Sequence, residues 1–455
     1  MGRTSLRTLK IPYLPLILGL CLSLSVIICL LLWEGHILRH SESRVYLQGW
    51  PSELLQHTVT LVALRDEPFI SLWNLHIQPP ALDTIRAILA NLVTASNPVE
   101  LLHKVDSAMY VIWALIYGAF IFLIYWWLLQ ASNLFIALIG AFIFALHPAG
   151  LLYATLLDGT ILSSFLIAVF IYLLWKIKQH HVVSPLLLSL SFLSLFFTRA
   201  IFQWPMLLVV IFSLVLLRYP HRKLLRFSLI TAAVVCLYLA KQFALFGITT
   251  TSSFAGLNFC KSIAACQTHP LTVLSDDTIK ALPMVLGKPK KLDQSINLND
   301  LPHLQLHQEL MQDYLEKIKT TPLNELVKYY AINLNIYLKP SSFYAEDNLV
   351  VLSLPKYWRE TYDEIFSQPW LSNILFLSLL LWLVNYKKGA LLPSIGLAIP
   401  IVAIFAISIL FENFENMRFK FFIEAPVYIF IITQWYGLYQ LLYQKFFPRK
   451  AVAPS

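Results

Sequence analysis

Charged side chains are scarce in this 455-residue chain: Lys, Arg, Asp and Glu make up 13% of it, whereas hydrophobic residues make up 58%. Soluble globular proteins carry about 25% charged residues and about 45–50% apolar ones. One water-soluble core cannot hold so large an apolar surplus, and the mean hydropathy of the chain is +0.67. The composition therefore excludes a soluble enzyme, a disordered scaffold and a fibrous protein. It predicts an all-α polytopic membrane protein.

Cysteine is also rare, with five residues in the chain. Cys21, Cys29 and Cys236 lie in apolar runs, where we expect buried, unreactive thiols. Cys260 and Cys266 lie six positions apart in a hydrophilic stretch. No further Cys or His stands beside them at the spacing of a metal site. A local disulfide is expected there if the stretch faces an oxidising compartment.

Ten apolar segments resemble membrane spans, since a helix needs about 20 residues to cross the hydrocarbon core. They cover residues 11–33, 107–130, 132–148, 153–175, 184–198, 201–217, 224–246, 369–386, 389–410 and 421–444. The two segments on either side of Arg199 are short and could form one bent hairpin instead. The first segment is longer than the apolar core of a cleaved signal peptide, so we interpret it as a retained anchor.

The net charge of +9 comes from 34 Lys and Arg against 25 Asp and Glu. No basic stripe interleaved with aromatic residues suggests nucleic acid as a partner, so we attribute the charge to cytoplasmic loops that face anionic lipid. With ten spans, the turn at 130–132 and all short basic clusters fall on one side of the membrane. These clusters are Arg3/Arg7/Lys10, Lys176/Lys178, Arg218/Arg222/Lys223/Arg226, Lys387/Lys388 and Lys445/Arg449/Lys450. The positive-inside rule then predicts that both termini are cytoplasmic. The membrane we expect is a bacterial inner or plasma membrane.

Two long hydrophilic segments would then face outward, at 34–106 and 247–367. Within the second, a helix pair is predicted at 303–319 and 322–338, because Thr321 can cap a helix whose first residue is Pro322. The predicted organisation has three parts: an N-terminal membrane module with the first outer loop, a mainly helical outer region and the C-terminal spans. Their ranges are 1–246, 247–367 and 368–455.

The ionisable residues closest to the membrane gather at the predicted outer ends of the spans. They are Glu34, Asp158, Arg199, Lys241, Glu412, Glu415, Arg418, Lys420 and Glu424. An ion-coupled transporter more often places carboxylates near the middle of the bilayer. Opposite charges that meet at the outer interface favour chemistry on an amphipathic substrate. The alternative is that each side chain simply extends to water from a helix end.

Several stretches, in order along the chain, resemble the GT-C glycosyltransferases, the group that includes protein mannosyltransferases and lipid A aminoarabinose transferases. They contain His76 with Pro79 and Pro80, Leu157 to Thr160, Thr198 with Arg199, Lys241 to Asn258, and Glu415 to Pro426. The resemblance implies a GT-C-like fold of about ten membrane helices with two large outer loops. It also implies transfer of a sugar from a polyprenyl-phosphate carrier to a lipid, glycan or protein acceptor at the outer face.

Such a transfer needs a carboxylate to accept the acceptor's proton. In GT-C enzymes this residue is usually an Asp soon after the first span, which the resemblance implies here as well. Glu42 lies at that distance and precedes Tyr46, but it is a Glu. The acidic pair Asp66 and Glu67 is the other candidate, and it lies farther from the first span.

Cations are needed for the carrier phosphate, and Arg199, Lys241 and Arg418 are the candidates. Asp158, His76 and Glu415 are candidates for positioning the acceptor or a metal, with Mg or Mn as the possible ions. Asp158 could instead cap the helix after it, and His76 could be an ordinary loop residue.

The leading functional hypothesis is therefore a membrane glycosyltransferase that acts as a monomer on a lipid-linked sugar donor, among membrane lipids. A transporter or flippase of lipid-linked glycans is one alternative. A non-catalytic assembly protein of the cell envelope is the other. Acids and cations that meet in one outward-facing site would favour the enzyme.

Overall fold

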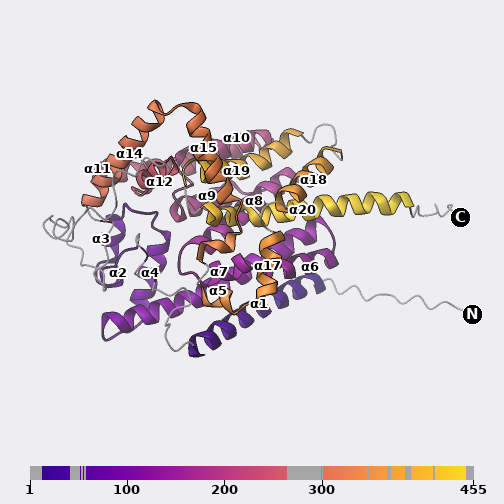
Figure 1. Cartoon of the computed structure of the whole chain (residues 1–455), viewed down its shortest axis with the longest axis horizontal. Coiled ribbons are helices and arrows are strands. Elements are labelled where there is room, and N and C mark those ends of the chain that lie inside the picture. The colour runs from indigo at the N-terminus through magenta and orange to yellow at the C-terminus, as the bar shows by residue number, and fades with distance from the viewer. Residues whose placement is uncertain are drawn as a thin grey trace, which may run out of the picture.

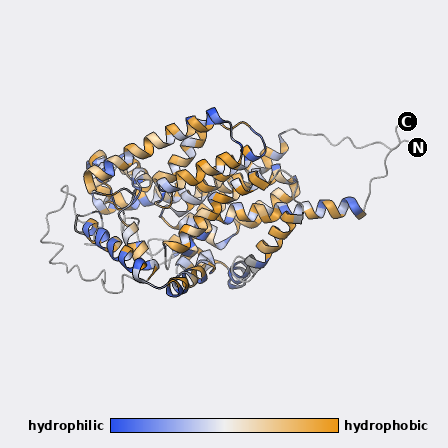
Figure 2. Ribbon diagram, turned by 90° about the horizontal axis from the view of Figure 1, so that it is seen from above, coloured by the Kyte–Doolittle hydropathy of each residue, from blue (hydrophilic) through white to orange (hydrophobic). Residues whose placement is uncertain are grey.

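The computed structural model describes residues 13–40, 52, 55, 58–263, 299, 301–345, 348–365, 370–384, 391–412 and 416–446. Within these residues the secondary structure is entirely helical. Figure 1 shows long helices that run side by side along the molecule, with both termini projecting from one end and α2, α3, α4 and α14 at the other. Hydrophobic residues dominate the helices of the bundle in Figure 2, and hydrophilic residues gather toward its ends.

Six helices of the described chain are long and apolar enough to cross a membrane. They are α1 (Leu14–His40), α5 (Pro98–Ala131), α8 (Thr160–Lys178), α11 (His221–Phe246), α19 (Leu391–Leu410) and α20 (Asn416–Phe446). A bent pair, α6 (Leu134–Ala145) and α7 (Pro148–Thr155), is a seventh if it forms one span. Shorter apolar helices are α9 (Pro185–Thr198), α10 (Trp204–Leu216) and part of α18 (Trp370–Val384). The prediction of an all-α multi-pass membrane protein is confirmed, and the count of ten spans stays a prediction.

One predicted boundary is wrong. The segment 153–175 was expected to be continuous, but α7 ends at Thr155 and α8 begins only at Thr160. Pro148 starts α7 after a break at His147, and the axes of α6 and α7 differ by 58°. A proline has no N–H to donate, so it is suited to the first turn of a helix and disrupts a continuous one.

The remaining helices belong to the segments between the apolar ones. They are α2 (Leu61–Asp66), α3 (Pro68–Trp73), α4 (Ala81–Leu92), α12 (Ala255–Ser262), α14 (Leu301–Thr320), α15 (Leu323–Tyr337), η4 (Ser341–Ala345), α16 (Leu349–Ser353) and α17 (Lys356–Ile365). The predicted helix pair in the second loop is present as α14 and α15. Helix α15 begins at Leu323, with Pro322 at the N-cap position, and the Thr321 hydroxyl donates to the Lys317 carbonyl of α14 instead of capping α15. Helix ends commonly differ by a residue or two.

Helix α5 is the centre of the bundle, and its buried face includes Trp113, Tyr117 and Phe120. Gly118 lets α1 approach it closely, since a Cβ there would collide with the side chain of Ile27. The Ser23 hydroxyl of α1 donates to the Gly118 carbonyl at 2.8 Å. Small residues and interhelical hydrogen bonds of this kind stabilise helix pairs in lipid, where the hydrophobic effect does not drive association.

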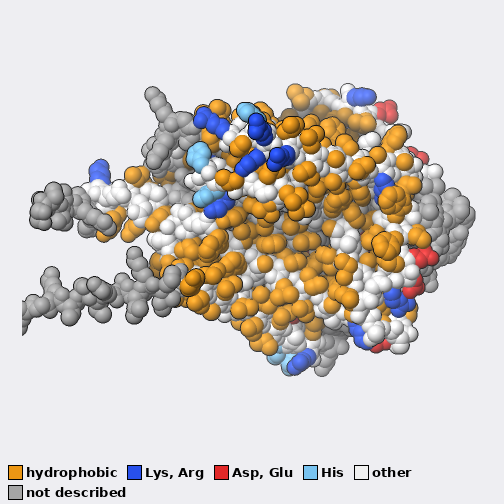
Figure 3. All heavy atoms as spheres, turned by 180° about the vertical axis from the view of Figure 1, so that it is seen from behind, with side chains coloured by type: hydrophobic (Ala, Val, Ile, Leu, Met, Phe, Trp, Pro, Cys, Tyr) orange, Lys and Arg blue, Asp and Glu red, His pale blue; other side chains and the backbone are white. Residues whose placement is uncertain are grey.

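Several bonds place the basic turns at one end of the bundle. Lys176 donates to Gln130 at 2.6 Å, and Asn133 donates to Tyr436 at 3.2 Å. The Tyr219 hydroxyl donates to the Val183 carbonyl at 2.9 Å. Figure 3 shows Lys, Arg and His gathered near the end from which the termini project, an apolar band beside them, and most visible acidic side chains beyond that band. The basic turns thus lie at one end of the bundle, and the cytoplasmic location of that end stays a prediction.

The cysteine expectations have mixed outcomes. Cys21, Cys29 and Cys236 are free but exposed on the outside of the bundle, so the expectation that they are buried in the protein is wrong. An apolar run in a membrane protein can face lipid as readily as protein. Cys260 is disulfide-bonded, and Cys266, its predicted partner, lies outside the described residues.

We expect reporter fusions to resolve the orientation. An enzyme that is active only outside the cytoplasm should be active when fused after residue 320, at the end of α14, and inactive when fused after residue 180. The reason is that the basic turns remain on the cytoplasmic side. As the control, a second reporter that is active only in the cytoplasm is fused at the same two positions. Activity of this second reporter at residue 320 would reverse the orientation.

Candidate functional site

Three helix ends meet at a buried carboxylate. Asp158 lies in the turn before α8, Arg199 follows the last residue of α9, and Arg418 lies in the first turn of α20. Nη2 of Arg199 and Nη1 of Arg418 are each 3.2 Å from Oδ2 of Asp158. Asp158 is 1% exposed and Arg418 is 7% exposed, while the side chain of Arg199 is 14% exposed. We refer to these three residues, with Thr160 and Tyr344, as the Asp158 cluster.

Thr160 and Tyr344 form hydrogen bonds with the three charged side chains of the cluster. The Thr160 backbone N–H donates to Oδ1 of Asp158 at 2.8 Å, and its hydroxyl donates to Oδ2 at 2.6 Å. Nη2 of Arg199 also donates to the Thr160 hydroxyl at 2.8 Å. Nη1 of Arg418 donates to the Tyr344 hydroxyl at 3.0 Å, and its guanidinium carbon lies 4.7 Å from the centre of the Tyr344 ring. Asp158 thus accepts from one N–H at the start of α8, in the manner of a cap, and pairs with two cations. Its role in positioning an acceptor or a metal stays a prediction.

The turn that carries Asp158 is fixed from α5. Nε1 of Trp113 donates to the carbonyls of Leu156 and Asp158 at 3.0 and 2.9 Å. Trp113 is fully buried. Because a buried carbonyl without a donor is costly, this indole keeps the turn in one conformation and the carboxylate aimed at both arginines.

The charges around Asp158 favour its ionised form. Burial alone would raise the pKa of Asp158, but the guanidinium groups of Arg199 and Arg418 and the two hydrogen bonds from Thr160 outweigh it. The pKa of Asp158 therefore lies below its ordinary value of 3.8. At neutral pH the cluster contains a carboxylate anion and two guanidinium cations.

A second buried polar group lies farther along α20. Oε1 of Glu424 accepts from the Ser341 hydroxyl at 2.6 Å and lies 3.9 Å from Nζ of Lys420. Oε2 of Glu424 lies 3.8 Å from Nε2 of His147, at the break between α6 and α7. The Tyr153 hydroxyl donates to the Ser341 carbonyl at 2.8 Å. Glu424 therefore pairs with Lys420 rather than with the arginines of the Asp158 cluster.

Lys241 lies in a different environment from the two arginines. Its Nζ lies 5.1 Å from the centre of the Tyr238 ring, 5.5 Å from that of Trp73 and 5.7 Å from that of Phe246. Tyr238 in turn packs edge-on against Phe197, two residues before Arg199. Lys241 and Arg199 thus stand on neighbouring helices, but Lys241 contacts aromatic faces, which attract a cation.

His76 joins the two outer segments. Its Nδ1 is 2.9 Å from the Ser253 hydroxyl, and its Nε2 is 3.0 Å from the Asn299 carbonyl. The ring is 2% exposed and lies 4.9 Å from the ring of Phe246. Because both ring nitrogens already have protein partners, these contacts favour the structural role over the role of an acceptor ligand.

The candidate bases are not brought into the Asp158 cluster by any contact between described residues. Asp66 and Glu67 are exposed at the break between α2 and α3, and Asp66 pairs with Arg65 at 3.0 Å. Glu42 and Glu415 lie outside the described residues. Of the predicted site residues, the structure therefore unites Asp158, Arg199 and Arg418.

Sequence analysis missed a buried ion pair in the first outer segment. Nη1 of Arg86 is 2.6 Å from Oδ1 of Asp83, and both side chains are fully buried. Nη1 of Arg86 also donates to the Val59 carbonyl at 2.7 Å. Close by, Asp106 accepts from the Ser52 N–H at 3.0 Å and from its hydroxyl at 2.5 Å. The available signal was the Asp and Arg three positions apart on an amphipathic helix, which places them on one face.

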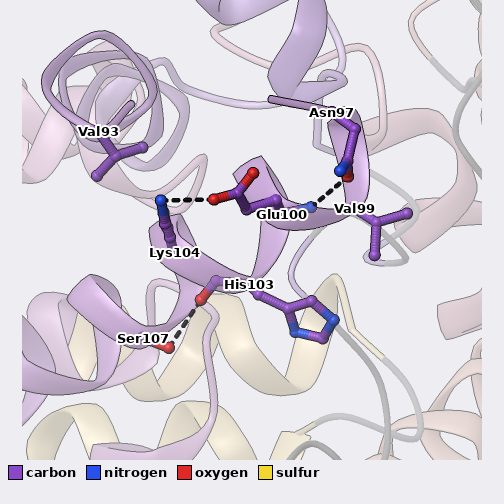
Figure 4. Close-up of a pocket in the computed structure, with 7 residues that line it drawn as sticks. All are labelled: Val93, Asn97, Val99, Glu100, His103, Lys104 and Ser107. Atoms are coloured by element: carbon purple, nitrogen blue, oxygen red, sulfur yellow. Dashed lines mark hydrogen bonds and ion pairs between the residues drawn. The ribbon is translucent and has the colours of Figure 1, made fainter. Parts of the chain in front are cut away.

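A separate open hollow of 630 Å³ lies at the start of α5. Figure 4 shows Glu100 and Lys104 turned toward each other, 2.7 Å apart, with the ring of His103 turned the other way. Val93, Asn97, Val99 and Ser107 complete its lining. The lining is exposed and includes no member of the Asp158 cluster.

The fit of a divalent metal is poor at Asp158. Both of its oxygens accept hydrogen bonds, and two guanidinium groups lie within 3.2 Å of Oδ2. A doubly charged cation beside two guanidinium groups would be strongly repelled. Among the described residues, no group of three or more His, Cys, Asp or Glu side chains is arranged to hold a metal ion.

Comparisons with known proteins add no assignment. No protein-family model matches the chain, and no curated protein matches its sequence.

We expect Asp158→Asn to destabilise the protein strongly, because it leaves two buried guanidinium groups without their carboxylate. Removal of one partner of a buried ion pair costs about 3–5 kcal/mol. Thermal unfolding of the purified protein in detergent measures the effect as a fall in Tm. The matched control is Asp66→Asn, which removes an exposed pair worth about 0–1 kcal/mol. Equal Tm values for the two variants would show that the cluster contributes no stability.

Because the pKa of Asp158 is lowered in the folded protein, its contribution to stability depends on pH. Its stabilising contribution is present at pH values above the ordinary pKa of 3.8 and is lost as the pH falls through the lower pKa of the folded state. The Tm difference between wild type and Asp158→Asn should therefore stay constant from neutral pH to about pH 5 and shrink only in stronger acid. A difference that disappears near neutral pH would contradict this.

Proposed function

We propose that the chain is a membrane glycosyltransferase of the GT-C type. It would move a sugar from a polyprenyl-phosphate carrier to an acceptor at the outer face of the membrane. The observation that carries the proposal is the convergence of Arg199 and Arg418, from helices more than 200 residues apart in sequence, on one buried carboxylate. The resemblance of the surrounding stretches to GT-C enzymes supplies the reaction class.

The level of the Asp158 cluster suits a lipid-linked donor. Asp158 precedes α8, Arg199 follows α9 and Arg418 opens α20, so all three lie where helices end rather than at their centres. A carrier lipid holds its phosphate at the membrane interface and its chain in the hydrocarbon. A guanidinium has five N–H donors in a planar fork, so it can bind Asp158 and a phosphate oxygen together.

In the proposed reaction, the bond between the anomeric carbon and the carrier phosphate breaks, and the acceptor oxygen bonds to the same carbon. The electron pair of the broken bond stays on the phosphate, where negative charge increases. Arg199 and Arg418 would stabilise this charge, and Asp158 would keep both guanidinium groups oriented before the substrate arrives. The proton of the acceptor hydroxyl passes to a carboxylate, for which Glu42, Asp66 and Glu67 remain the candidates.

The proposal predicts that Arg418→Ala lowers sugar transfer on the order of 10²-fold, because a charge-assisted phosphate contact is lost in the transition state. Arg418→Lys should restore part of the rate, since it keeps the charge but loses the planar fork. The measurement is transfer of labelled sugar from polyprenyl-phosphate donors in proteoliposomes, with and without a chelator. Arg199 still pairs with Asp158 in these variants, so we expect them to fold.

Lys104→Ala is the matched control, because it removes an exposed cation near the start of α5 and should leave transfer unchanged. Size-exclusion profiles establish that each variant is intact. Wild-type transfer by an intact Arg418→Ala protein would disprove the phosphate-binding role. Movement of the labelled lipid across the bilayer without sugar transfer would instead identify a flippase. Absence of both activities would favour the non-catalytic assembly protein.

A further inference from the structure

Helix α3 buries almost nothing in the protein. It has six residues, Pro68 to Trp73, of which Ser71 alone is buried. Phe69 is 88% exposed, Ile70 is 51% exposed and Trp73 is 60% exposed. A helix of six residues is not stable by itself in water. In the protein α3 buries Ser71 and packs Leu72 against the core, which leaves Phe69, Ile70 and Trp73 on its outer face. Another apolar environment must stabilise its outer face.

Helix α3 is nevertheless held at a defined level. The Ser71 hydroxyl donates to the Ala63 carbonyl of α2 at 3.1 Å. The Trp73 ring lies 5.5 Å from Nζ of Lys241 on α11. Two residues after Trp73, the carbonyl of Leu75 accepts from Nε2 of Gln242 at 3.1 Å. These contacts fasten the C-terminal end of α3 beside the last turns of a helix that is apolar enough to cross a membrane.

Helix α11 also exposes large apolar side chains. On α11, Leu237 is 72% exposed, Phe243 is 62% exposed and Leu245 is 45% exposed. Helix α11 has 26 residues, about 39 Å at 1.5 Å per residue, whereas the hydrocarbon core is about 30 Å thick. Its first turns contain His221, Arg222, Lys223 and Arg226, and its last turns contain Lys241 and Gln242, so polar residues at both ends mark where α11 leaves the hydrocarbon core. The contacts with Lys241 and Gln242 place α3 at this depth.

We propose that α3 is an interfacial membrane helix. It lies in the leaflet at the end of the bundle away from the termini, with Phe69, Ile70 and Trp73 among the lipid headgroups and upper acyl chains. Three charged residues, Arg65, Asp66 and Glu67, precede it and stay in water. Tryptophan beside a lysine is typical of this depth, and short apolar faces bind there by burial in the interface. The proposal depends on membrane insertion and not on sugar transfer.

Site-specific fluorescence tests the proposal. Cys21, Cys29 and Cys236 are exposed free thiols, so each is first changed to alanine. Phe69→Cys is then introduced and labelled with a polarity-sensitive dye in the full-length protein, which is reconstituted into phosphatidylcholine vesicles. The quenchers are lipids with a nitroxide near the headgroup, lipids with a nitroxide near the chain end, and aqueous iodide. Two reference positions are Leu237→Cys on α11 and Glu316→Cys on α14, whose side chain is exposed on a hydrophilic helix.

The label at position 69 should be quenched several-fold more by the headgroup-level nitroxide than by iodide. Iodide should quench the label at 316 most strongly, and the deep nitroxide should quench the label at 237. Iodide quenching at 69 equal to that at 316 would overturn the proposal, because the face would then be in water. Protection from both iodide and nitroxide would overturn it as well, because another protein or a second copy would cover α3. Phe69 is so exposed that its replacement removes little packing, and size-exclusion chromatography checks each variant.

Discussion

One set of helix ends in this bundle is organised around the carboxylate of Asp158. It is the shared partner of Arg199 at the end of α9 and Arg418 at the start of α20, and it also binds the first N–H of α8. Helices α9 and α20 both pack against α8, and this one side chain joins the ends of all three. Two like charges brought this close repel unless an anion lies between them, so the geometry of both arginines depends on this one carboxylate.

Helix α20 shows how the rest of the structure adapts to that constraint. Its first eleven residues, from Asn416 to Pro426, are all buried, although they include Arg418, Lys420 and Glu424. Each charge has an opposite partner close by: Asp158 for Arg418, and Glu424 for Lys420. Nearer the C-terminus the same helix exposes large apolar and aromatic side chains such as Trp435 and Tyr439. One continuous helix therefore begins inside the protein and ends with its side chains exposed on the outside of the bundle. Because the buried first part contains charged residues, the apolar segment found in the sequence starts only at residue 421.

Features of the fold that depend on composition and periodicity could be predicted from the sequence. The all-helical membrane class, the positions of the apolar segments and the α14–α15 pair follow from hydropathy and from the Thr321 and Pro322 punctuation. Arg199 and Arg418 were both named as candidates for one carrier phosphate. Asp158 was a candidate for positioning an acceptor or a metal, or for capping a helix, and was not paired with either arginine. Which acid meets which base depends on tertiary packing, and a single sequence does not encode that pairing in any local pattern. The aromatic surroundings of Lys241 were missed for the same reason. The buried pair of Asp83 and Arg86 differs, because its spacing of three positions on an amphipathic helix is a local signal.

The proposed chemistry and the predicted stabilising effect of Asp158 depend on the same interaction. A phosphate that approaches Arg199 meets a guanidinium already oriented by Asp158 and Thr160, so little reorganisation is needed when negative charge develops. The carboxylate that orients the arginines also competes with the phosphate for them, which weakens binding of the resting substrate. That competition decreases as the leaving phosphate gains charge, because attraction to the arginines increases with the charge while the field of Asp158 stays constant. An arrangement of this kind favours the transition state over the bound donor, which is the condition for catalysis rather than tight binding.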